Sequence, residues 1–168
     1  MLFLSGAVVV LLLETNLLRW GVALWVTMLI AVVDWNLYLF LYQPIRYTAR
    51  SLEHLSVLAN LSGMFFSSAA IVGMHSYLGG DKWIPVTAVS FCGLTLLEQS
   101  LWVSKCTWKE SRRFLVCATA ALAALTAELL WLPFLLWVTA AILCVCSYLL
   151  LGVARHVYSE TYTAAIGR

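Results

Sequence analysis

Charged residues are scarce along the whole of this 168-residue sequence. They make up 11% of the chain, whereas hydrophobic residues make up 63%. A soluble domain carries roughly 25% charged residues and about 45–50% apolar ones. A folded chain of this size leaves much of its surface exposed, so a chain this apolar cannot hide its side chains within itself. Water is therefore excluded as the solvent for most of the surface, and the lipid bilayer takes its place.

Enzyme and cofactor motifs are also lacking. The sequence contains no P-loop and no GxGxxG, HExxH, GxSxG or CxxC pattern. No basic run with interleaved aromatic residues is present, which argues against nucleic acid as a partner. None of the five cysteines falls in an external loop, so we expect small apolar packing residues rather than disulfides or metal ligands. The sequence therefore predicts no metal site and favours a protein that is not an enzyme.

Long apolar segments dominate what is present. Residues 1–13 are apolar but short for a span, because a spanning helix needs about 20 residues. They can cross by borrowing residues 14–18, or they re-enter or lie in the interface instead. The longer apolar segments are residues 22–43, 52–77, 83–103, 114–130 and 134–153. We therefore predict an all-α, polytopic transmembrane helical bundle of six spans, or five if the first segment does not cross. Residues 1–168 are expected to form a single integral membrane domain with no soluble domain.

The connections alternate between basic and non-basic. Residues 44–51, 105–113 and the polar tail 155–168 hold two, four and two Lys or Arg. Residues 78–82 hold one, which Asp81 offsets, and residues 131–133 hold none. Basic connections stay on the cytoplasmic side of a membrane, so we predict cytoplasmic N- and C-termini for six spans. We interpret the basic loop 105–113 as a topological anchor, with partner docking through Trp108 as the alternative.

Acidic residues inside the predicted spans are the main candidates for function. Asp34 and Glu98 both fall roughly 10–14 Å from the cytoplasmic helix ends, so at this similar depth they could face one another across a helix pair. Asn36 and Gln99 are their polar neighbours, and Glu128 lies near an external end. A charge at this depth costs roughly 2.5–3.5 kcal/mol and is rarely kept without a purpose. Three interpretations stay open: an ion or proton path, hydrogen-bonded acids that fix helix pairing, and pairing with a basic residue of a partner subunit.

Two histidines raise the question of haem. His54 and His156 both fall at cytoplasmic helix ends, and two inward-facing histidines at one depth are typical of haem b anchors. These two lie at headgroup level instead, so no cofactor is predicted and haem b is kept only as a weak alternative. Glu53 beside His54, together with the basic loop, raises a membrane-embedded lipid-modifying enzyme as a further weak alternative.

The leading hypothesis for function is a small multi-pass channel or transporter coupled to ions or protons. Six helices are too few to enclose a pathway alone, so a homo-oligomer is expected under this hypothesis. The alternative is a non-enzymatic subunit or assembly scaffold of a larger membrane complex. Its motivation is a small-residue face, which lets membrane helices approach closely, at Gly63, Ser67, Ala70 and Gly73. The expected partners are the lipid bilayer and copies of the chain or other membrane subunits.

Overall fold

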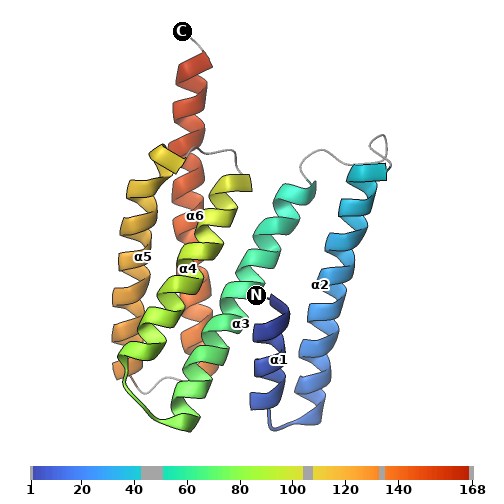
Figure 1. Ribbon diagram of the computed structural model, residues 1–168, viewed down its shortest axis with the longest axis vertical. Helices are drawn as coiled ribbons and strands as arrows, with labels where there is room; N and C mark the ends of the chain where they lie inside the picture. Colours follow the sequence, from blue (N-terminus) through green and yellow to red (C-terminus); the bar gives the residue numbers. More distant parts are fainter. Residues whose placement is uncertain (1, 43–50, 104–107, 133–134, 167–168) are drawn as a thin grey trace.

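Six helices make up the computed structural model (Figure 1), which describes residues 2–42, 51–103, 108–132 and 135–166 and has no strand within those ranges. The helices are α1 (Leu2–Leu12), α2 (Asn16–Tyr42), α3 (Ser51–Leu78), α4 (Trp83–Val103), α5 (Trp108–Trp131) and α6 (Leu136–Ile166). Successive helices run in opposite directions. In this part of the chain five helices are long and apolar enough to cross a membrane. The predicted all-α membrane bundle is confirmed.

The first apolar segment forms a half-length helix. α1 has 11 residues and is about 16 Å long, roughly half the hydrocarbon core of a bilayer. The chain turns after Leu12, and α2 starts at Asn16, so residues 14–18 do not lengthen the first helix as one prediction required. Arg19 Nε donates a hydrogen bond of 2.6 Å to the Leu13 carbonyl. A side chain of α2 thereby satisfies a carbonyl beyond the end of α1, where the helical ladder leaves such groups unpaired.

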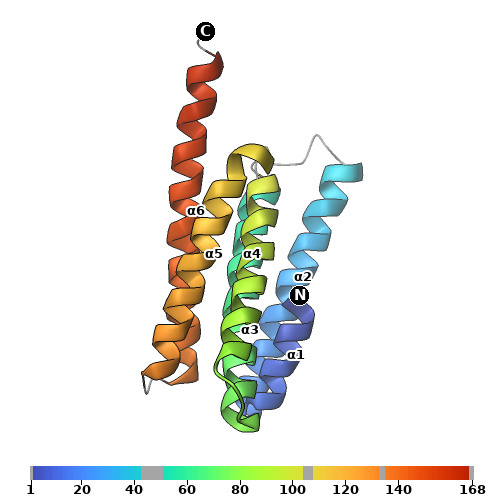
Figure 2. The same ribbon diagram turned by 60° about the vertical axis from the view of Figure 1, so that its left-hand side comes forward.

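α3 is the centre of the arrangement. It packs against α1, α2, α4 and α6, and α5 completes a four-helix bundle with α3, α4 and α6. Met64, Leu97 and Leu122 lie in the core of that bundle. On the other side of α3, the α1–α2 hairpin packs around a second, smaller core that includes Val9 and Phe66. Two views of the ribbon show the hairpin as a separate layer beside the bundle (Figures 1 and 2).

Small residues bring the helices close together. A Cβ atom added at Gly93 of α4 would lie 2.8 Å from Cδ1 of Leu122 on α5. A Cβ atom added at Gly73 of α3 would lie 2.7 Å from Cδ1 of Leu12 on α1. The small-residue face predicted on α3 is buried at all four of its positions: Gly63, Ser67, Ala70 and Gly73. This face is therefore used for packing within the chain.

The turn between α3 and α4 matches the prediction from its sequence. Gly79 and Gly80 have φ values of 64° and 141°, which glycine adopts without a steric penalty. The carboxylate of Asp81 accepts a 3.2 Å hydrogen bond from the backbone N–H of Trp83, so it caps α4. Pro85 lies in the first turn of this helix, where its missing N–H costs nothing.

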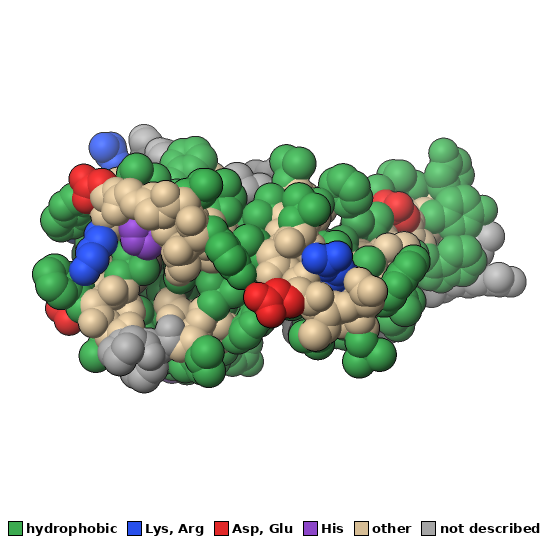
Figure 3. Space-filling model, turned by 90° about the horizontal axis from the view of Figure 1, so that it is seen from below, with side chains coloured by type: hydrophobic (Ala, Val, Ile, Leu, Met, Phe, Trp, Pro, Cys, Tyr) green, Lys and Arg blue, Asp and Glu red, His purple; other side chains and the backbone are tan. Residues whose placement is uncertain are grey.

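Tryptophans gather at the end of the molecule that carries this turn. Trp20, Trp83, Trp131 and Trp137 all belong to helix termini at this end, as expected for an interfacial belt. Lys82 Nζ lies 3.9 Å from the centre of the Trp131 ring, which ties the α3–α4 turn to the end of α5. Figure 3 shows this end with a few charged side chains among hydrophobic ones.

At the opposite end, two segments expected to be irregular are helical. α6 continues to Ile166, so the predicted polar tail is a helix that projects beyond its neighbours (Figures 1 and 2). α5 begins at Trp108, so most of the predicted basic loop is helical, with Arg112 and Arg113 exposed. No proline or glycine that would stop a helix falls within residues 108–113 or 155–166. Lys105 lies outside the described residues.

Candidate functional site

An apolar groove of about 620 Å³ runs between α1 and α2 and ends at Asp34. We call it the α1–α2 groove. Its walls include Gly6 and Ala7 of α1 and Ala23 and Ala31 of α2. Among the described residues that line it, Asp34 is the only one with an ionisable side chain. The groove therefore combines small apolar walls with a single carboxylate, which lies about 12 Å from the end of α2 at Tyr42.

α2 is held to the rest of the chain along a narrow strip. Val26 and Leu29 are its buried residues, and it packs only on α1 and α3 among the described helices. On the side away from the α1–α2 groove, a second hollow of about 450 Å³ separates α2 from α3 and α6. Trp25 and Phe65 line that hollow. Most of α2 is thus available to lipid or to another protein.

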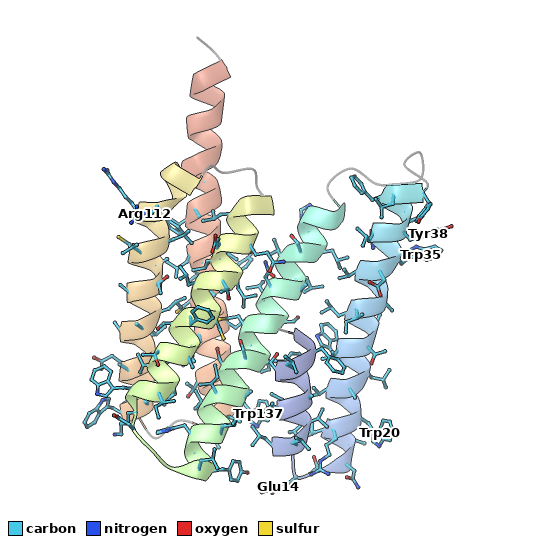
Figure 4. All side chains as sticks on the ribbon, viewed as in Figure 1. Glu14, Trp20, Trp35, Tyr38, Arg112 and Trp137 are labelled. Carbon is cyan, nitrogen blue, oxygen red and sulfur yellow. The ribbon has the colours of Figure 1, made fainter. Side chains whose placement is uncertain are left out.

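A row of aromatic side chains follows Asp34 on the exposed part of α2. The ring centres of Trp35 and Tyr38 are 5.9 Å apart, and those of Tyr38 and Tyr42 are 5.1 Å apart. Figure 4 shows Trp35 and Tyr38 pointing away from the bundle. Tyr38 lies four residues after Asp34, so the two share a face of the helix. Asp34 therefore lies where the small-residue groove meets the aromatic row.

The other polar candidates are spread over different surfaces. Asn36 Nδ2 donates to the Val32 carbonyl at 2.8 Å, a bond within α2. Glu98 and Gln99 are exposed on α4, and Glu128 is exposed on α5. Within the described part of the chain, no ion pair is formed by any of these acids or by Asp34.

Asp34 and Glu98 do not face one another within one chain. Across the described helices, α2 and α4 make no packing contact. The reason is that α3 lies between them, and the short α1 holds α2 on the far side of α3. The expectation of a facing carboxylate pair is therefore wrong for the single chain, although a role for either acid alone stays a prediction.

The interior of the four-helix bundle is closed. The cavity between α3, α4 and α6 has a volume of about 10 Å³, at the lower limit for one water molecule. At its edge, Asn60 Nδ2 donates a 2.7 Å hydrogen bond to Ser100 Oγ on α4. This pair was not predicted from the sequence. The available signal was a polar residue in each of two successive spans, which is typical of an interhelical hydrogen bond.

The histidines do not form a ligand cluster in the part of the chain that is described. His54 on α3 and His156 on α6 are both exposed, while the side chain of Glu53 lies outside the described residues. No three side chains of the metal-binding types come together among the described residues. Haem b and lipid modification stay predictions.

Comparison with known proteins gives no family: no family model, no curated protein and no solved structure matches the chain. The chain's own geometry carries the functional inference. Its main features are a closed bundle, a loosely attached α2 and an exposed carboxylate on that helix.

Proposed function

We propose that this protein is a non-enzymatic subunit that assembles with another integral membrane protein through the outer side of α2. The observation that carries the proposal is the position of Asp34. It is exposed on a membrane-spanning helix and has no ion-pair partner among the described residues. A charge facing lipid costs roughly 2.5–3.5 kcal/mol on insertion scales. A hydrogen-bond donor supplied by a partner subunit offsets that cost, because the carboxylate and the donor then face each other instead of the lipid.

The arrangement of the four-helix bundle supports the same proposal. The bundle holds a cavity of only about 10 Å³, and its small-residue face is buried against its own helices. α2 is the least buried of the candidate spans, and on it Trp35 and Tyr38 are 62% and 44% exposed. Aromatic side chains of this kind are enriched at protein interfaces.

Ion or proton transport is the second candidate, and it requires an oligomer. Exposed acids on three different helices, Asp34, Glu98 and Glu128, favour it, because several copies could bring such acids to a shared path. Purified protein in liposomes would then dissipate a proton or cation gradient, and Asp34→Asn or Glu98→Gln would slow the flux. Flux that is absent, or unchanged in both variants, removes this candidate.

We also propose that the end opposite the α3–α4 turn faces the cytoplasm. Among the described residues, Arg19 and Lys82 belong to the end with the turn, whereas Lys109, Arg112 and Arg113 lie at the start of α5, at the opposite end. The larger number of basic residues at the opposite end follows the positive-inside rule if that end is cytoplasmic. The position of the N-terminus stays a prediction.

Extraction in a gentle detergent followed by native mass spectrometry tests the assembly proposal. We expect a stoichiometric complex with a second membrane protein in the wild type and a loss of that partner in Asp34→Asn. Glu128→Gln is the matched control, since it removes an exposed acid from α5 and should keep the partner. A single species without a stoichiometric partner contradicts the proposal.

A further inference from the structure

We infer that the α1–α2 groove receives a transmembrane helix of the partner, and that this helix carries a Lys or Arg at the depth of Asp34. The inference rests on the proposed function, because it names the class of partner for the same surface. Three features of the groove support it: its shape, its single charge and the aromatic row beyond it.

The shape of the groove fits a helix better than a lipid chain. It follows α2 from Val22 to Asp34, which is about 18 Å, or a little more than three helical turns. Ala7 on one wall and Ala23 and Ala31 on the other have small side chains. Such residues let another backbone approach closely, which is how membrane helices gain packing energy against one another.

The charge selects among the helices that could fill this shape. Asp34 ends the groove, and its natural complement in hydrocarbon is an ammonium or guanidinium group. A second copy of this chain does not supply one. Its long spans hold basic residues only at their ends: Arg19 in Asn16–Tyr42, and Arg112 and Arg113 in Arg112–Trp131. The occupant is therefore a different polypeptide with a basic residue inside its own span.

The aromatic row extends the same site toward the end of α2. Tyr38 lies one turn beyond Asp34, and its ring is stacked on that of Trp35 and tilted against that of Tyr42. A cation held at the Asp34 carboxylate would lie near these ring faces, which attract positive charge. The carboxylate and the rings together thus favour a basic residue over a neutral hydrogen-bond donor.

Synthetic transmembrane peptides test the inference directly. The probe is a Leu-rich, 21-residue peptide with one Lys about 12 Å from one end, and the control peptide has Leu at that position. Fluorescence energy transfer measures their association with the labelled full-length protein in phosphatidylcholine vesicles. We expect the Lys peptide to bind about tenfold more tightly than the Leu peptide. Equal binding of the two peptides overturns the inference.

Variants of the protein assign the effect to the groove. Asp34→Asn should abolish the preference for Lys, and Asp34→Lys should reverse it in favour of a peptide with Glu at the same position. A reversal cannot come from misfolding. Ala31→Leu should weaken binding of both peptides by filling the groove, whereas Ala124→Leu, on the exposed side of α5, should leave it unchanged. A preference for Lys that survives in Asp34→Asn also overturns the inference.

Peptide binding and native mass spectrometry separate the two claims. A stoichiometric partner without a preference for the Lys peptide keeps the proposed function and removes the groove as its site. Selective binding of the Lys peptide without a stoichiometric partner keeps the groove and removes the proposed function.

Discussion

Two buried polar side chains on α3 differ in whether they have a partner. Asn60 is 6% exposed and donates to Ser100 Oγ. Ser68 is 1% exposed, and its Oγ has no hydrogen-bond partner in the described part of the chain. In the membrane an interhelical hydrogen bond contributes about 0.6 kcal/mol on average and up to about 1.7. The two residues therefore contribute to stability in opposite ways despite similar burial.

Asn60→Leu and Ser68→Ala test this difference. Leucine keeps most of the volume of asparagine but removes the bond to α4, so we expect a loss of about 1 kcal/mol in the free energy of unfolding. Ser68→Ala removes a hydroxyl that has no partner, so stability should be unchanged or slightly higher. Unfolding in mixed detergent micelles, followed by circular dichroism, measures both. Equal losses in the two variants would contradict the assignment of the hydrogen bond.

Among the helices, the close contact between α4 and α5 occurs at a glycine of α4, which has no side chain. A larger residue at Gly93 would have to displace the side chain of Leu122, which lies 2.8 Å from the position of an added Cβ atom. Gly152 of α6 has no atom within 4 Å of an added Cβ, so it provides the same residue type without the contact. The pair separates helix packing from the backbone preferences of glycine.

We expect Gly93→Leu to lower the free energy of unfolding by about 1–3 kcal/mol or to prevent folding, because overpacking forces neighbouring side chains and helices to move. Gly152→Leu should be tolerated, and both variants gain the same helix propensity. The same detergent unfolding experiment measures the difference. A Gly93→Leu protein as stable as Gly152→Leu would show that α4 and α5 are not closely packed there.

At the scale of the whole molecule, the structure predicts which positions share a side of the membrane. Glu14 and Leu78 are exposed at the end with the α3–α4 turn, and Arg112 is exposed near the other end (Figure 4). In a cysteine-free background, single cysteines at positions 14 and 78 should react with a membrane-impermeant maleimide on intact cells. A cysteine at position 112 should react only after permeabilisation.

Two outcomes of the labelling have different meanings. Labelling of positions 78 and 112 from the same side would contradict the topology of the helices. Labelling of position 112 alone on intact cells would keep the topology and reverse the proposed orientation.

Much of this architecture could be predicted from the sequence. The segment 83–103 coincides with α4, and the turn at Gly79 and Gly80 was evident from its residues. The hydropathy of a segment shows that it avoids water but does not show which helices it packs against. A helix that mostly faces lipid, such as α2, therefore has the same apolar composition as a helix that is surrounded by other helices. For this reason the separation of Asp34 from Glu98 could not be predicted, whereas a short first helix was one of the alternatives that residues 1–13 left open.

Among the described helices, α3 provides the main attachment of the α1–α2 hairpin, and this has a mechanical consequence. Its core is smaller than that of the bundle, and local stability follows the apolar contacts that a unit makes. Pulled from the N-terminus in an atomic force microscope, the chain should release α1 and α2 first, in a separate step at low force. The four remaining helices should then resist as one unit. A helix bound in the α1–α2 groove would raise the force of the first step and leave the second unchanged.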